Sequence, residues 1–110
     1  MYTTFKNIKA FEKDGKEPFT DWFNALKDKT AQAKILIRLE RVRYNNYGYH
    51  KRLGGDFLEL KEKFFGGIRI YIGEEEKYLI VLLFGGNKFS QKKDIKKALE
   101  YCQEYKNNKT

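Results

Sequence analysis

Hydrophobic residues recur at the three- and four-residue spacing of an amphipathic helix in three segments of the chain. The first segment begins at Pro18, a residue suited to the first turn of a helix, and the second runs over residues 30–44. The third begins after Ser90, which can cap a helix N-terminus. The apolar stripes of the three predicted helices are, in order, Phe19, Trp22, Phe23 and Leu26; Ala31, Ile35, Leu39 and Val42; and Ile95, Leu99 and Cys102.

Between the second and third predicted helices, apolar and polar residues alternate in the pattern of half-buried strands. The segment 78–84 is apolar on both faces, so we expect it to lie in the centre of a sheet. The predicted extended segments are 2–12, 50–56 (a loop or short edge strand), 57–65, 68–73 and 78–84. This order predicts a single α+β domain over residues 1–110, a mostly antiparallel sheet with two N-terminal helices and one C-terminal helix.

The sequence FFGGIRIYIG, residues 64–73, determines which side chains share a face of the predicted hairpin. Three isoleucines alternate with Arg69 and Tyr71, so the isoleucines are expected to face the core. A three-residue loop or a glycine bulge keeps the apolar residues of both strands on one face. In that register Lys63 lies opposite Arg69 and Lys61 lies opposite Tyr71. The prediction is a face opposite the core that carries these four residues.

Charge adds a candidate partner, because 23 basic and 15 acidic residues give the chain a formal net charge of +8. Such a charge favours binding to a polyanion such as nucleic acid, or to an acidic protein surface. The basic residues gather over residues 27–52 and 88–97. Within the first cluster, Lys34, Arg38 and Arg41 are expected to form a basic ridge on the solvent side of the second helix. The two clusters flank the Arg69 strand, which favours a phosphate-binding surface.

Cysteine and histidine occur once each, at Cys102 and His50. A single cysteine excludes an internal disulfide and favours a cytoplasmic protein. The two residues together are too few for a typical zinc site, so no metal or cofactor is expected. No apolar run approaches the ~18 residues of a membrane span, and the N-terminus does not have the features of a secretory signal peptide.

Several motifs, taken in order, resemble a known family. They are WFNAL at 22–26, AKILIRLERV at 33–42, NNYGYHKRLGGDFLELK at 45–61, GGIRIYI at 66–72 and VLLFGGNKFSQKKDIKKALEY at 81–101. They are similar to the phage-derived addiction-module killer proteins, HigB-like type II toxins of the RelE/ParE toxin superfamily. The resemblance covers residues 18–105, and GGNKFSQ followed by Asp94 and Ile95 is its most specific part.

The resemblance implies a RelE-like domain that is the toxin of a type II toxin–antitoxin module. Many members are metal-independent mRNA endoribonucleases (mRNA interferases) that act on messages at the ribosome, inhibit translation and arrest growth. A cognate antitoxin, often a helix-turn-helix protein, holds the toxin inactive in the cytoplasm. By position, the resemblance implies site roles for Arg69 and Tyr71 of the Gly-x-x-Arg-x-Tyr motif, for Lys88 and Gln91 of the last motif, and for Lys51 after the turn.

Cleavage of RNA by its own 2′-hydroxyl requires removal of a proton, stabilisation of charge on phosphorus and protonation of the leaving oxygen. Arg69 is expected to hold the scissile phosphate, because a guanidinium matches two phosphate oxygens. Lys61 and Lys88 are expected to strengthen the positive field, and Tyr71 to act as an acid or to stack on a base. The residues expected to bind RNA around this catalytic set are Lys51, Arg52, Lys63, Gln91 and Lys92.

The sequence leaves two other functions open. A ParE-like toxin binds a protein target such as gyrase and cleaves nothing, although such a binder has no need for the cationic face around Arg69. An inactive relative that only binds RNA or its partner is the third possibility. It is kept open by Lys61, where the family has arginine, and by Asn87, where aspartate is common; Tyr49 also stands where aspartate is common.

Overall fold

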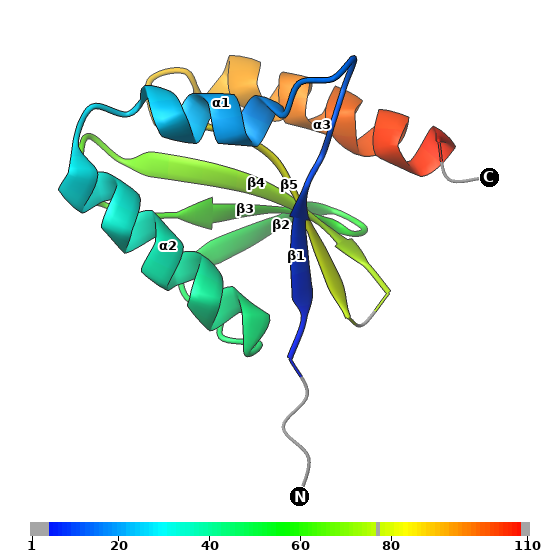
Figure 1. Ribbon diagram of the computed structural model, residues 1–110, viewed down its shortest axis with the longest axis horizontal. Coiled ribbons are helices and arrows are strands. Elements are labelled where there is room, and N and C mark those ends of the chain that lie inside the picture. Colours follow the sequence, from blue (N-terminus) through cyan, green and yellow to red (C-terminus); the bar gives the residue numbers. More distant parts are fainter. Residues whose placement is uncertain (1–4, 77, 109–110) are drawn as a thin grey trace, which may run out of the picture.

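Five strands form one sheet, with two helices on one face and one helix on the other (Figure 1). The computed structural model describes residues 5–76 and 78–108, so positions 2–4 of the predicted N-terminal segment lie outside the described residues. The strand order across the sheet is β1-β5-β4-β3-β2. The strands are β1 Asn7–Ala10, β2 His50–Gly54, β3 Phe57–Lys61, β4 Ile68–Glu75 and β5 Leu79–Asn87, and the helices are α1 Pro18–Ala25, α2 Lys29–Arg43 and α3 Gln91–Asn107.

The α+β class predicted from the hydrophobic pattern is confirmed. The pairs β2–β3, β3–β4 and β4–β5 are antiparallel, whereas β1 runs parallel to β5, so the sheet is mixed. Strand β5 lies between β1 and β4, as its apolar sequence predicts, and the segment after Tyr49 forms the edge strand β2. Over the described residues, we find no helix with the length and hydrophobicity needed to cross a bilayer.

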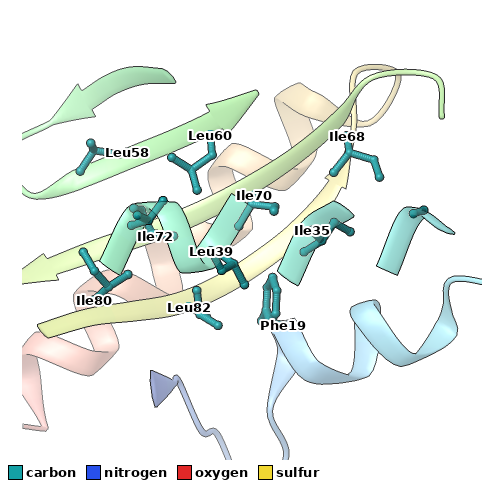
Figure 2. Close-up of a cluster of buried hydrophobic side chains, with 12 residues drawn as sticks. Phe19, Ile35, Leu39, Leu58, Leu60, Ile68, Ile70, Ile72, Ile80 and Leu82 are labelled. Carbon is teal, nitrogen blue, oxygen red and sulfur yellow. The ribbon is translucent and has the colours of Figure 1, made fainter. Parts of the chain in front are cut away.

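Helices α1 and α2 cover the face of the sheet on which the isoleucines of β4 lie (Figure 2). The predicted stripe of α2, from Ala31 to Val42, is buried against this face. In Figure 2, Ile35 and Leu39 of α2 lie over Ile70 and Ile72 of β4. Each large aliphatic side chain buried in this way contributes about 1.5–3 kcal/mol. The same burial makes a one-residue slip of β4 costly, because such a slip would turn the isoleucines away from α2.

Helix α3 covers the opposite face, which the alternation in β4 had predicted to be a free working surface. Phe57, Tyr71, Val81 and Leu83 of the sheet pack there against Ala98, Tyr101 and Cys102 of α3. Leu99, predicted to lie on the apolar stripe of this helix, is exposed, because Ala98 and Cys102 face the sheet instead. Both faces of the sheet therefore carry a core, and α3 leaves the part of its face beyond the helix N-terminus, beside Arg69, uncovered.

The turn between β3 and β4 is longer than the sequence suggested, and the predicted pairing of Lys63 with Arg69 is wrong. Lys61 lies opposite Arg69, and residues 62–67 leave the ladder. The cause is three consecutive residues with positive φ, which curl the turn: Phe65 at 50°, Gly66 at 76° and Gly67 at 89°. The register moves by an even number of residues, so the odd-numbered side chains still share one face.

Arg38, predicted on a solvent-facing basic ridge, is instead 5% exposed. Its guanidinium donates hydrogen bonds to the main-chain oxygens of Tyr47, Tyr49 and Lys61, at 2.6, 2.7 and 2.9 Å. It also forms an ion pair with Glu62. One side chain of α2 thus fixes the segment that enters β2 to the end of β3, and in doing so it positions Tyr49 beside Lys61.

Two consecutive glycines of β5 let groups from both faces come unusually close to the sheet. A Cβ atom on Gly85 would lie 2.2 Å from the ring of Trp22 on α1, and one on Gly86 would lie 1.9 Å from Oδ2 of Asp94 on α3. Neither position can accept a methyl group in this packing. Because Gly86 pairs with Arg69 across the ladder, the start of α3 is held directly beside that arginine.

The two ends of the β3–β4 hairpin carry opposite charge. Lys61 and Arg69 stand at one end, and the pair of Phe57 with Gly73 marks the other. At that second end, a cavity of about 390 Å³ is lined by acidic residues together with Cys102 and Lys106; the acidic residues are Asp56, Glu74, Glu75 and Glu76.

Candidate functional site

Three cations predicted to act together lie in a row across adjacent strands. Lys61 ends β3, Arg69 lies opposite it in β4, and Lys88 follows the end of β5. Two like charges directly opposed in a ladder are destabilising by a few tenths of a kcal/mol or more. The arrangement is therefore one that an anion between the side chains would stabilise.

Arg69 is half-buried and has few protein partners for its charge. Its Nη1 donates to the main-chain oxygens of Ile68 at 3.1 Å and Glu62 at 3.4 Å, and its buried Nε has no hydrogen-bond partner. Within residues 5–76 and 78–108, no carboxylate forms an ion pair with this guanidinium. A partly desolvated arginine that keeps unused donors is suited to a phosphate or carboxylate ligand.

Gly67 lets Lys88 approach Arg69. This glycine has a φ of 89°, and a Cβ there would lie 3.1 Å from Cδ of Lys88 and 3.4 Å from Nη1 of Arg69. The amide of Lys88 donates to the oxygen of Gly67 at 2.8 Å, which fixes the end of β5 to the turn. Because Gly67 has no side chain, the side chains of Lys88 and Arg69 can both lie next to its backbone.

Glu59 is fully buried and lies beneath Lys61 in β3. Its Oε1 lies 3.9 Å from Nζ of Lys61, and its Oε2 accepts a 2.8 Å hydrogen bond from Nε2 of Gln91 at the start of α3. Gln91, predicted to bind RNA, therefore uses its amide nitrogen to anchor α3 over the carboxylate. Glu59 was not predicted as a site residue, although its spacing of two residues from Lys61 in β3 indicated that the two side chains share a face.

Tyr71 is fully buried and lies opposite Glu59, not opposite Lys61 as predicted. Burial raises the pKa of its phenol well above the ordinary value, and the nearby Glu59 carboxylate raises it further. The phenol is therefore neutral at physiological pH. Because α3 covers it, Tyr71 is not accessible to stack on a base.

The remaining predicted RNA-binding residues are spread around this centre. Lys51 of β2 is exposed and pairs with Glu59 across the ladder, and Lys92 is exposed on the first turn of α3. Arg52 is directed to Glu74, with Nη1 2.8 Å from Oε1, so its charge is compensated away from the site. Lys63 lies in the β3–β4 turn, where it lines a cavity of about 480 Å³ between that turn and α2, and Lys61 and Tyr49 line the same cavity.

Two exposed aromatic residues next to these cations were not predicted as site residues. Phe89 follows Lys88 and is 82% exposed, and Tyr49 lies beside Lys61 and is 58% exposed. The loop that carries Phe89 is fixed by Asn87, whose Oδ1 accepts hydrogen bonds from the amides of Phe89 at 2.8 Å and Ser90 at 3.1 Å. An aromatic residue in an otherwise polar loop, GGNKFSQ, was the available sequence signal for Phe89.

Acidic, histidine and cysteine side chains do not gather into a metal-binding set in the part of the chain that the structure describes. Ser90 occupies the N-cap position of α3 as predicted, but its hydroxyl binds the carboxylate of Asp94 and caps no helix amide. The open chemistry of the site is thus cationic and aromatic.

Comparison with known proteins provides one relative of substantial length. No family model matches the chain. An uncharacterized protein of Haemophilus influenzae is 37% identical over 86 residues, which span 78% of this chain and 87% of that protein. Identity of this level over most of both chains shows common descent and a common fold. The chain therefore belongs to the same family as this uncharacterized protein of Haemophilus influenzae.

Proposed function

We propose that this protein is the toxin of a type II toxin–antitoxin module, with a RelE-like fold, and that it cleaves mRNA in the cytoplasm and so inhibits translation. The observation that carries the proposal is the environment of Arg69. Its half-buried guanidinium lies between Lys61 and Lys88 and has no carboxylate partner among the described residues. A phosphodiester supplies the negative charge that this arrangement is missing.

The chemistry proposed is attack by the 2′-oxygen on the adjacent phosphorus, with cleavage of the bond to the 5′-oxygen. Arg69 holds two oxygens of the phosphate, and Lys61 and Lys88 stabilise the additional charge of the phosphorane. The 2′-hydroxyl loses a proton and the 5′-oxygen gains one, so the products are a 2′,3′-cyclic phosphate and a 5′-hydroxyl. Protein cations provide the charge stabilisation, and the reaction as proposed uses no metal.

Glu59, Tyr71 and Gln91 support the cations from below. The buried carboxylate of Glu59 holds Lys61 near the ladder, and Gln91 ties the start of α3 to that carboxylate. Tyr71 fills the space beneath them and does not touch RNA in this proposal. These contacts fix the cations before the substrate arrives, which lowers the cost of assembling the site.

The proposed partner that controls the toxin is a cognate antitoxin, encoded beside it and expected to be a helix-turn-helix protein. A chain with a net charge of +8 is suited to an acidic antitoxin segment that covers the cationic row. Addition of the antitoxin should then prevent RNA binding. If a stable toxin–antitoxin complex still bound RNA as tightly as the free toxin, this mode of inhibition would be wrong.

The test of the activity compares the parent protein with Arg69→Ala, using single-stranded RNA in vitro and primer extension on cellular mRNA. Loss of one group that stabilises transition-state charge typically lowers the rate by about 10²–10³-fold. Arg69→Lys should retain part of the activity, because it keeps the charge and loses the two-point contact. An Arg69→Ala protein that is folded by circular dichroism and still cleaves mRNA at the parent rate would refute the proposal.

The same experiment separates the proposal from a ParE-like function. A gyrase-directed toxin would inhibit DNA supercoiling and leave cellular mRNA intact. Cells that express the parent protein or Arg69→Ala would then show the same uncleaved mRNA. Growth arrest with intact mRNA and inhibited supercoiling would therefore support the alternative. An inactive relative would produce neither growth arrest nor cleavage.

A further inference from the structure

Two exposed aromatic rings flank the cationic row, and each is covered on one side by a lysine of that row. Nζ of Lys61 lies 5.3 Å from the centre of the Tyr49 ring, and Nζ of Lys88 lies 5.3 Å from the centre of the Phe89 ring. The rings are 58% and 82% exposed, so most of each remains available to a ligand. Single exposed aromatic residues are common on protein surfaces, and what distinguishes these two is that the cation over each ring belongs to the row.

The strand order places these groups in a line. Tyr49 accepts a 2.9 Å hydrogen bond from the amide of Lys61 at the outer side of β3, Arg69 follows in β4, and Lys88 and Phe89 follow the end of β5. The line crosses three inter-strand spacings of about 4.8 Å, or roughly 14 Å in total. Its order is aromatic, cation, cation, cation, aromatic.

Both rings are held by contacts that do not involve a ligand. Arg38 fixes the main chain of Tyr49 through a 2.7 Å hydrogen bond, and Asn87 fixes the main chain of Phe89 through a 2.8 Å hydrogen bond. The main-chain positions from which the two rings project are therefore fixed, Tyr49 beside Lys61 and Phe89 directly after Lys88. Fixed aromatic side chains lose little entropy when a planar ligand stacks on them.

We propose that Tyr49 and Phe89 stack the bases of single-stranded RNA on the two sides of the phosphate held by Arg69. This inference rests on the proposed function and extends it, because it assigns the residues that hold the strand in an extended form across the site. A cationic surface combined with aromatic platforms is the usual means of binding single strands without a fixed sequence. A double helix does not fit this arrangement, because its bases are already stacked on each other.

The test measures the binding of a short single-stranded RNA with 2′-O-methyl groups, which cannot be cleaved through its 2′-oxygen, by fluorescence anisotropy. Phe89→Ala and Tyr49→Ala are each expected to weaken binding by about 5- to 100-fold, the range measured for loss of one stacked base. Phe89→Trp and Tyr49→Phe should bind close to the parent, because each keeps an aromatic ring. Tyr78→Ala is the matched control, since Tyr78 is 54% exposed and lies at the opposite end of β5.

Two further readouts distinguish stacking from indirect loss of a phosphate contact. The salt dependence of binding should be unchanged in Phe89→Ala, because an aromatic ring neutralises no phosphate. Replacing one base of the oligonucleotide by an abasic residue should weaken parent binding at two positions, and each alanine variant should be insensitive at one of them. A weaker salt dependence in both alanine variants, or no effect of abasic residues, would overturn the stacking proposal.

Failure of this inference can be told apart from failure of the proposed function. If the parent cleaves RNA and the two alanine variants bind and cleave like the parent, stacking is refuted and the endoribonuclease proposal stands. If the parent neither binds nor cleaves RNA, both proposals are refuted. The inference would be supported if Phe89→Trp, Tyr49→Phe and Tyr78→Ala all bound RNA as tightly as the parent protein while Phe89→Ala and Tyr49→Ala bound it more weakly.

Discussion

At Gly85 and Gly86, the absence of a side chain determines how closely two helices approach the sheet. Trp22 of α1 lies over the first glycine, and Asp94 of α3 lies over the second. The glycine pair of the GGNKFSQ motif is therefore explained by packing from both faces of the sheet. Its effect on the site is indirect, because Gly86 sets the place of α3 beside Arg69.

Gly86→Ala is expected to destabilise the protein by about 1–3 kcal/mol, the usual cost of forcing an extra methyl into a packed core. The added Cβ would lie 1.9 Å from Oδ2 of Asp94, so part of α3 must move. Urea unfolding measures the change. The double variant Gly86→Ala, Asp94→Ala should lose less stability than the sum of the two single changes, and strict additivity would show that this contact is not the cause.

Tyr71→Phe tests the place of the phenol in the site. Because Tyr71 is fully buried and its pKa is raised by burial, its hydroxyl is not available as an acid to a bound phosphate. We expect RNA cleavage by the variant to stay within a few-fold of the parent rate, whereas Arg69→Ala should be strongly impaired. A loss of about 100-fold in Tyr71→Phe, with unchanged unfolding, would return the phenol to a catalytic role.

At the scale of the elements, Arg38 shows how a helix residue can define a loop. Three main-chain oxygens from outside α2 accept its hydrogen bonds, and Glu62 pairs with its charge. The same clamp fixes Tyr49 and the end of β3 at Lys61. Helix α2 thus contributes to the site without supplying a side chain that touches it.

Arg38→Met is expected to lower the free energy of unfolding by about 3–5 kcal/mol, as when one partner of a buried ion pair is removed. Arg38→Lys should recover only part of this loss, because an ammonium cannot reproduce the planar fork of donors with which the guanidinium reaches three main-chain oxygens. Arg41→Ala, an exposed change on the same helix, is the control and should leave the stability nearly unchanged. Equal stability of Arg38→Met and Arg41→Ala would contradict the clamp.

The parts of the fold that could be predicted from the sequence are those whose pattern lies within one helix or strand. The isoleucine alternation of β4 and the stripe of α2 are local patterns, and the structure confirms both. The burial of Arg38 was not predictable, because its acceptors come from a loop and from β3. The register of the hairpin was missed because non-glycine Phe65 adopts a positive φ beside two glycines, which lengthens the turn.

The candidate site was predictable in part for the same reason. The shared face of Lys61 and Arg69 follows from strand alternation, which survived the change of register. The burial of Tyr71 depends on where α3 lies, and no pattern within β4 contains that information. Phe89 and Tyr49 were not predicted as site residues, because a binding role for an exposed aromatic residue can be inferred only when its neighbours in space are known.

At the scale of the whole molecule, positive charge should dominate binding to RNA. The row contributes three cations, Lys61, Arg69 and Lys88, and a single strand releases about 0.7 counterions for each phosphate contact. The logarithm of the association constant should therefore fall with the logarithm of salt concentration with a slope of about −2 or steeper. Lys88→Ala should make this slope shallower by about 0.7, and an unchanged slope would place Lys88 outside the phosphate contacts.

The acidic cavity at the far end of the β3–β4 hairpin gives the molecule a polarity along its strands. Cations gather at one end and acidic residues at the other, where Lys6 and Arg52 pair with Glu74 and Lys106 pairs with Asp56, so we expect an electric dipole in addition to the net charge of +8. In the field of a polyanion, such a dipole experiences a torque that turns the cationic end forward before contact. The protein would therefore meet a nucleic acid already oriented, with its site leading and its acidic end facing away.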